Sequence, residues 1–426
     1  MVAAQVPSGQ VDLFPARRHK LENGLLLIHQ QVTAAPVVTV DVWVRAGAAL
    51  EPEAWSGMAH FLEHMIFKGT AQLPPGRFDQ IIENRGGFTN AATSHDYAHF
   101  FISTAAADLP DTLPHLADLL LHAAIPDEEF EHERDVVLEE IRQSFDDPDD
   151  VGFQVLMETL YPTHAYGRPV LGDAERLIDR TPQEMRWFHQ AHYQPDNMTV
   201  VVVGDVPWED TLALVSQNFA DFAQRTDCPR SPARPELPLT EIRRQVLEMP
   251  RLGQARLMLG WVTPGVESLH SAYGLDLLSA LIASGRTSRL VRELREERQL
   301  VQDIHSGFTL QRDSSLFTLT AWLDPAQLGP VEAIISDRLS ELAALPISEA
   351  ELRRCQRLLC NDYAFSSETA GQLAGLYGYY STLAQPELAL VYPKMIASYN
   401  PEMLQQLAAQ HLSPLRYGAV TLLPLE

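Results

Sequence analysis

The sequence lacks long apolar runs and has few cysteines. No stretch reaches the roughly 20 apolar residues that a transmembrane helix needs, so we predict no membrane span. The three cysteines, Cys228, Cys355 and Cys360, form no even set for a disulfide framework, which favours a reducing compartment. Residues 1–20 hold no apolar core of a signal peptide, and a cytoplasmic location is therefore expected.

Basic residues are also scarce. The chain has 32 Lys and Arg against 56 Asp and Glu, which gives a net charge of −24. Binding to phosphate backbones needs a basic patch, so we predict no nucleic-acid partner. The acidic excess has two interpretations. It keeps the protein soluble, or it gives a cavity a negative potential that favours basic peptides.

What the sequence does contain is a pair of histidines inside an apolar segment, residues 59–65. His60 and His64 are four residues apart, with Glu63 between them. On a helix, positions i and i+4 share one face, so both imidazoles can reach a single ion. Catalytic zinc takes three protein ligands of the His and carboxylate type and leaves a fourth position open. The segment therefore predicts a zinc site that is one ligand short.

A second helical segment, residues 127–142, offers the missing acid. Glu133 and Glu140 are seven residues apart, which is two helical turns, so they lie on the same face. Val136 and Val137 lie between them. We therefore expect this face to point inward, toward the two histidines.

These residues resemble a known family. The run H-F-L-E-H-M-I-F-K-G-T, followed 76 residues after His64 by the second Glu of V-V-L-E-E-I, resembles the pitrilysin-type (M16, inverzincin) zinc peptidases. That family includes the mitochondrial processing peptidase and half-size bacterial relatives. The resemblance covers most of the chain, and it implies that His60, His64 and Glu140 bind Zn²⁺. It also implies that Glu63 is the catalytic base and that Glu133 supports the site.

An internal repeat predicts a duplicated α+β fold. V-W-V-R-A-G at 42–47 recurs as G-W-V-T-P-G at 260–265, and H-Y-Q-P at 192–195 recurs as H-L-S-P at 411–414. Each half alternates strand-like and helical segments, as an α+β layer does. We expect two homologous domains, residues 1–225 with the zinc site and 241–426 without one, joined by a proline-rich linker at 226–240.

The second copy also tests the metal site. A shift of 218 or 219 residues replaces every polar member of the site by a hydrophobic one: Leu278, Leu281, Ile282, and Leu358 or Leu359. The shared fold therefore does not require polar residues at these positions. Their presence in the first half indicates a function.

A strand expected at residues 97–103 is the candidate platform for a peptide substrate. It follows the N-A-A-T turn, and we expect Asn90, Ala91, Ala92 and Tyr97 to contact the substrate. A sheet edge beside the zinc can accept an extended peptide as one more strand, with affinity from backbone hydrogen bonds and loose sequence choice.

The sequence therefore predicts a zinc endopeptidase acting on short or unfolded peptides. The alternative is a noncatalytic structural or assembly subunit of the same fold. The resemblance implies an Arg and Tyr pair in the half opposite the zinc, and residues 316–325 offer neither. A family chamber has four such domains and this chain supplies two. We expect a second half-size subunit, with a heterodimer favoured over a homodimer.

Overall fold

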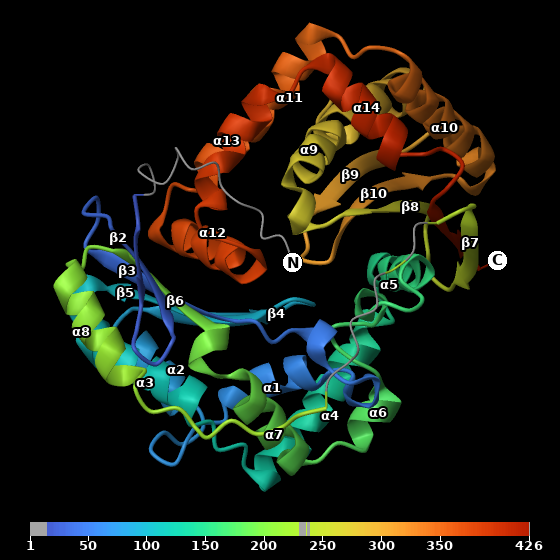
Figure 1. Ribbon diagram of the computed structural model, residues 1–426. Helices are drawn as coiled ribbons and strands as arrows, with labels where there is room; N and C mark the ends of the chain where they lie inside the picture. Colours follow the sequence, from blue (N-terminus) through green and yellow to red (C-terminus); the bar gives the residue numbers. More distant parts are fainter. Residues whose placement is uncertain (1–14, 230–235, 237–238, 426) are drawn as a thin grey trace.

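The computed structural model describes residues 15–229, 236 and 239–425. The remaining residues, which include 1–14 and most of the expected linker at 226–240, lie outside the described part of the chain. The described residues form two β-sheets, each with its own helices. The C-terminal half lies above the N-terminal half in the view of Figure 1.

The first sheet belongs to the N-terminal half. Its strands are β1 (Arg17–Lys20), β2 (Leu26–Gln31), β3 (Val37–Val44), β4 (Phe88–Thr93), β5 (Ala98–Ala105) and β6 (Met198–Gly204). They are ordered β1-β2-β6-β3-β5-β4. β2 and β6 are parallel, and all other neighbours are antiparallel. Every residue of β6 is buried, which suits its run of four valines because β-branched side chains pack well in a sheet covered on both faces.

The second sheet repeats this arrangement. Its strands are β7 (Arg243–Met249), β8 (Ala255–Pro264), β9 (Asp303–Thr309), β10 (Ser314–Leu323) and β11 (Gly418–Pro424). Their order, β7-β11-β8-β10-β9, matches β2-β6-β3-β5-β4. The parallel pair is again at the same place, between β7 and β11. The predicted duplication and the α+β class are thereby confirmed.

Helices cover both sheets. Those of the N-terminal half are α1 (Met58–Ile66), α2 (Arg77–Glu83), α3 (Leu109–Leu121), α4 (Asp127–Ser144), α5 (Pro148–Leu160), α6 (Ala174–Ile178), α7 (Pro182–His192) and α8 (Trp208–Asn218). Those of the C-terminal half are α9 (Leu269–Ala283), α10 (Leu328–Ala344), α11 (Glu349–Phe365), α12 (Ala370–Leu383), α13 (Leu388–Ser398) and α14 (Pro401–His411). Among the described residues, no helix has both the length and the apolarity that crossing a membrane requires.

Short helical turns connect these elements. They are η2 (Ala48–Leu50), η3 (Glu53–Trp55), η4 (Ala106–Asp108), η5 (Ala165–Gly167), η6 (Pro195–Asn197), η7 (Val266–Ser268), η8 (Val291–Glu297) and η9 (Pro325–Gln327). η2 and η3 lie directly before α1, so they determine how the chain enters the helix that carries the two histidines.

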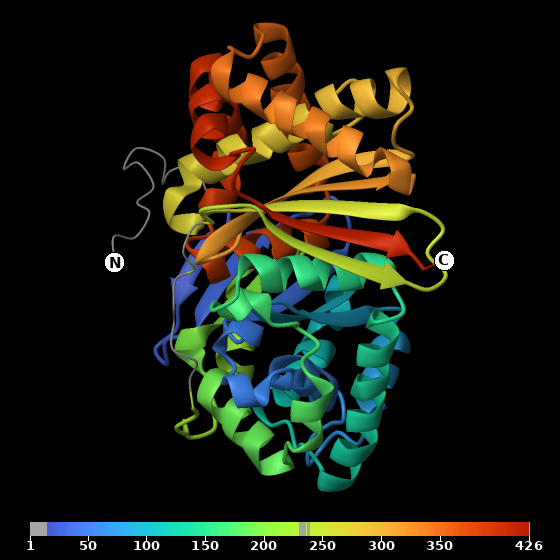
Figure 2. The ribbon, with the colours of Figure 1, turned by 90° about the vertical axis from the view of Figure 1, so that its right-hand side faces the viewer.

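The two halves exchange one helix each. α12 of the C-terminal half packs on β3 and β6 of the first sheet, and α5 of the N-terminal half packs on β8 and β11 of the second. Figure 2 shows the green α5 directly beneath the strands of the second sheet. Close approach is possible because glycines face the incoming side chains: Gly260 and Gly418 lie against Leu156 and Leu160, and Gly378 lies against Trp43.

Candidate metal centre

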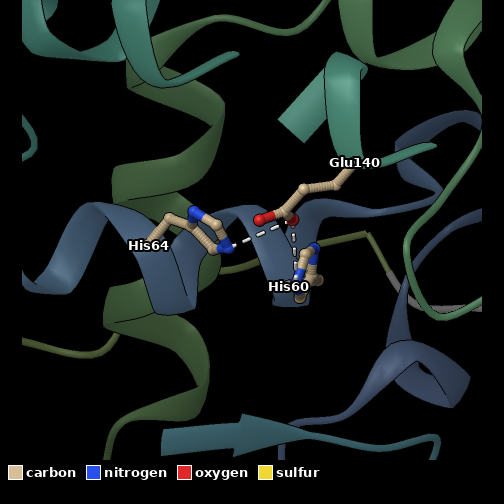
Figure 3. A group of neighbouring side chains, drawn as sticks. All are labelled: His60, His64 and Glu140. Atoms are coloured by element: carbon tan, nitrogen blue, oxygen red, sulfur yellow. Dashed lines mark ion pairs between the residues drawn. The ribbon is translucent and has the colours of Figure 1, made fainter. Parts of the chain in front are cut away.

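His60, His64 and Glu140 converge between α1 and α4, as Figure 3 shows. One ligand atom of each lies within 4.8 Å of the others, and no other such group of three occurs in the part of the chain that the structure describes. Glu140 Oε2 is 3.8 Å from His60 Nε2 and 3.5 Å from His64 Nε2. Ligand atoms of a tetrahedral zinc site lie roughly 3.4 Å apart. The three residues therefore fit a zinc ion in donor type, and the distances from Glu140 to the two histidines lie close to this spacing.

His60 is in the protonation state that a metal ligand needs. Burial, and to a lesser extent the charge of His64, lower the pKa of His60 to about 4. The ring is therefore neutral at pH 7, with a free electron pair. Its Nδ1 is buried and has no hydrogen-bond partner, so Nε2, which faces Glu140, is the ring's remaining polar atom.

Glu133 holds His64 through the ring nitrogen that does not face Glu140. Its Oε1 lies 2.9 Å from His64 Nδ1, and its other oxygen pairs with Lys68. Burial alone would lower the pKa of His64, but the hydrogen bond to Glu133 and the charge of Glu140 outweigh burial and raise it. A carboxylate on the far nitrogen orients the ring and directs Nε2 toward the ligand position. Glu133 thus contacts His64, a candidate ligand, and is not a member of the group of three.

Glu63 lies on the same helix and is held by the edge of the sheet. Thr93 Oγ1 donates a hydrogen bond of 2.6 Å to Glu63 Oε2. Burial raises the pKa of Glu63, and the bond from Thr93 only partly opposes this. A carboxylate with a raised pKa is better matched to proton transfer near neutral pH.

β4 lies beside α1 and is the last strand of the first sheet among the described residues. We expected residues 97–103 to form an edge strand that could bind the substrate. This prediction is wrong, because β5 pairs with β3 on one side and with β4 on the other. The alternating pattern identified a strand there but could not give its position in the sheet. Asn90 and Ala92, on β4, are exposed, and Ala91 is half-buried.

Tyr97 lies apart from the open edge. Its ring centroid is 4.7 Å from that of Trp43 and 6.1 Å from that of Tyr379 on α12. Burial raises the pKa of the Tyr97 hydroxyl. The residue therefore packs where α12 meets the first sheet.

The face of α4 that holds Glu133 and Glu140 is only partly covered. Val137 is fully buried, as expected, whereas Val136 is 45% exposed. Successive residues of a helix are about 100° apart, so only one of two neighbours can face the core. The side of α4 that carries Val136 is therefore open.

A cavity of about 1040 Å³ adjoins the end of α4. It lies among α4, α5, α6 and the segment that connects them, and Ile141, the neighbour of Glu140, lines it. Acidic residues outnumber arginines in its wall: Glu53, Asp150, Glu158, Asp173 and Glu175 against Arg168 and Arg176.

The equivalent place in the C-terminal half holds hydrophobic residues. Leu278, Leu281 and Ile282 of α9 are buried, and Leu358 and Leu359 of α11 pack against the same core. Sequence reasoning missed Thr93 and Lys68 on the N-terminal side, although both belong to segments that it singled out. Their partners are 30 and 65 residues away, and no local spacing indicates such pairs.

A duplicated α+β fold with this cluster at a sheet edge has the architecture of the pitrilysin-type peptidases. Residues 26–174 match the family model for insulinase (peptidase family M16), and residues 179–359 match that for the peptidase M16 inactive domain. The chain belongs to peptidase family M16.

Individual relatives agree with this assignment. An uncharacterized zinc protease of Mycobacterium leprae is 31% identical over 336 residues, 79% of this chain and 75% of the relative. The crystal structure of a protease from Helicobacter pylori superposes with a TM-score of 0.89 at 27% identity, covering 96% of this chain and 99% of that one. Pitrilysin has the same fold, with a TM-score of 0.79 at 20% identity; 97% of this chain matches only 45% of that chain.

Proposed function

We propose that the protein is a zinc-dependent endopeptidase that cleaves peptides or unfolded segments. The observation that carries the proposal is the convergence of His60, His64 and Glu140 from two helices, beside the acid Glu63 and an open sheet edge. Relatives named zinc proteases support the choice of metal.

The side chains divide the chemistry among them. His60, His64 and Glu140 would hold zinc, which supplies Lewis acidity toward the scissile carbonyl and an activated water. Glu63 takes a proton from the attacking water and gives it to the leaving amine. The bond from Thr93 occupies Oε2 of Glu63 and leaves Oε1 for this proton.

β4 would bind the substrate as an added strand. The exposed edge of β4 offers backbone hydrogen-bonding groups, and Asn90, Ala91 and Ala92 lie along it next to α1. This mode gives affinity with little sequence choice. The acid-rich cavity beside α4 adds a preference for basic side chains.

A noncatalytic subunit of the same fold is the alternative function. Such a subunit is expected to carry degraded ligand positions, and here each of His60, His64 and Glu140 has a metal-binding side chain. The chain matches 45% of pitrilysin, which supports a role as one half of a larger chamber. We propose that it is the catalytic half, paired with a distinct half-size subunit in preference to a second copy, because a second copy would still lack the Arg and Tyr pair.

Metal analysis together with peptide cleavage tests the proposal. Glu140→Gln should lose zinc and activity, while Glu139→Gln, which alters the adjacent exposed acid that pairs with Arg142, should bind about one zinc per chain as the wild type does. A chelator should abolish cleavage of a quenched fluorescent peptide, and added zinc should restore it. Undiminished zinc in Glu140→Gln would remove Glu140 from the ligand set. Undiminished zinc in His64→Ala would refute the site.

A further inference from the structure

The proposed centre depends on how α1 is held, because His60, Glu63 and His64 all lie on this helix of nine residues. The residue before it, Gly57, has φ of 93° and no side chain with which to cap the helix. The first N–H groups of a helix have no partner within it, and buried ones need an acceptor from elsewhere.

Glu51 supplies that acceptor. Its Oε1 accepts a hydrogen bond of 2.6 Å from Ala59 N, and its Oε2 accepts one of 2.9 Å from Gly57 N. Glu51 is 0% exposed. Burial disfavours the ionised form and raises the pKa of Glu51 to about 8, whereas the two N–H donors and the positive end of the helix dipole favour a carboxylate at this position. Because the site is buried, water cannot readily replace the acceptor if it is removed.

Glu51 is itself held by the segment that follows α5. Arg168 Nη2 donates to the backbone carbonyl of Glu51 at 2.9 Å and to that of Ala48 at 3.2 Å. Gly172 packs closely against the residue that precedes α1, since a Cβ at Gly172 would lie 2.3 Å from Gly57 Cα. Residues 166–172, Y-G-R-P-V-L-G, take no part in the proposed metal binding or proton transfer, and they support the entry to α1.

We propose that Glu51 is a positioning residue of the metal centre. Its carboxylate fixes the first turn of α1, where His60 lies directly after Ala59. His64 lies one turn later and is oriented separately by Glu133. Removal of the Glu51 acceptor therefore displaces His60 more than His64 and distorts the ligand set without unfolding the domain. This inference rests on the proposed metal site.

Cobalt binding tests the inference without reference to catalysis. Co²⁺ replaces zinc, and its visible absorption reports the coordination geometry. Glu51→Gln keeps the side-chain volume but turns one acceptor into a donor that faces an N–H group. The matched control is Asp147→Asn, because Asp147 caps α5 by accepting from Asp149 N at 2.8 Å, and α5 carries no ligand.

The expected result is a Co²⁺ affinity weaker by on the order of tenfold in Glu51→Gln, with an altered spectrum. Asp147→Asn should keep the affinity and spectrum of the wild type. Unchanged affinity and spectrum in folded Glu51→Gln would overturn the inference, as would an equal loss in Asp147→Asn. If Glu51→Gln does not fold, Glu51→Asp, whose carboxylate is one carbon shorter and withdrawn from the two N–H groups, gives the readout: weaker Co²⁺ binding supports the inference and unchanged binding overturns it. A wild type that binds neither Co²⁺ nor Zn²⁺ would instead refute the proposed function.

Discussion

At the candidate metal centre, His64 and Glu63 are each held by another side chain. Glu133 orients His64 and pairs with Lys68, and Thr93 holds Glu63. Such partners restrict the rotamers of the groups that do chemistry, so the geometry is set before a substrate arrives. The same burial that requires these partners lowers the pKa of His60 and raises that of Glu63.

Replacement of Glu63 should separate metal binding from catalysis. Glu63→Gln keeps the size of the side chain but cannot accept a proton, so turnover of a quenched peptide should fall by roughly 10²-fold or more. Zinc content, measured by elemental analysis, should stay at the level of the wild type. Glu139→Gln, which alters an exposed acid on α4 that pairs with Arg142, should leave both quantities unchanged. Loss of zinc in Glu63→Gln would make Glu63 a ligand, and full activity would assign the base elsewhere.

His189 should make the protein less stable at low pH. The ring is buried on α7 with Nε2 at 2.8 Å from the Leu120 carbonyl oxygen, and burial lowers its pKa to about 4. The unfolded chain binds this proton near pH 6.5, so the contribution is complete above that pH and is lost as pH falls toward 4. The loss is about 3 kcal/mol at most.

Denaturant unfolding across this range measures the effect. His189→Gln has no titrating ring, so its free energy of unfolding should depend less on pH between 6.5 and 4 than that of the wild type. His305→Gln, at an exposed position on β9 of the other half, serves as the control. Equal pH dependence in His189→Gln and the wild type would contradict the prediction.

At the scale of single residues, spacing in the sequence predicted which side chains could lie on the same face of a helix. Two histidines four apart on a helix share a face by geometry alone, and the structure brings them to Glu140. Glu51 could not be found in this way. Its partners are backbone N–H groups of Gly57 and Ala59, which every sequence has, and they carry no residue-specific signal.

At the scale of helices and strands, the exchange of α5 and α12 is the main finding that the sequence did not predict. Hydrophobic periodicity shows that a face is buried but not against which partner. The order of strands has the same limit, since β4 and β5 have similar alternation and only pairing decides which is the edge.

A glycine pair on α12 tests how tightly the exchanged helix packs. A Cβ at Gly378 would lie 2.0 Å from Trp43 Nε1, whereas one at Gly375 would meet nothing within 4 Å. Gly378→Ala should therefore lower the free energy of unfolding by roughly 1–3 kcal/mol through overpacking. Gly375→Ala should raise it by about 0.5–1 kcal/mol, because alanine favours helix. Chemical denaturation measures both, and a Gly378→Ala variant as stable as the wild type would argue against close packing of α12.

At the scale of the whole molecule, the repeat predicted two domains, and the matching strand orders confirm it. Within the described residues, the one group of side chains able to hold a metal ion lies in the first domain. The second domain has leucines and an isoleucine at the equivalent positions of α9 and α11, so the duplicated fold does not depend on the candidate ligands.

Efficient peptidase activity should require a second half-size subunit. An interface of this kind is expected to bury more than roughly 1,000 Å² and to survive size-exclusion chromatography with light scattering. The chain alone has a mass of 47.6 kDa, so the active species should have about twice that mass. Full activity from a species of 47.6 kDa would refute the requirement. Activity from a pure homodimer would refute only the preference for a distinct partner.

The exchanged helix also has a consequence for the order in which the chain is made. The face of β3 and β6 that carries Trp43 is covered by α12, which begins at Ala370, far downstream of the end of β6 at Gly204. A ribosome adds about 5–20 residues per second. The interval between synthesis of β6 and synthesis of α12 is therefore roughly 10–30 s, and during it this face of the sheet is uncovered. The first domain to leave the ribosome is therefore completed only after most of the second half has been made.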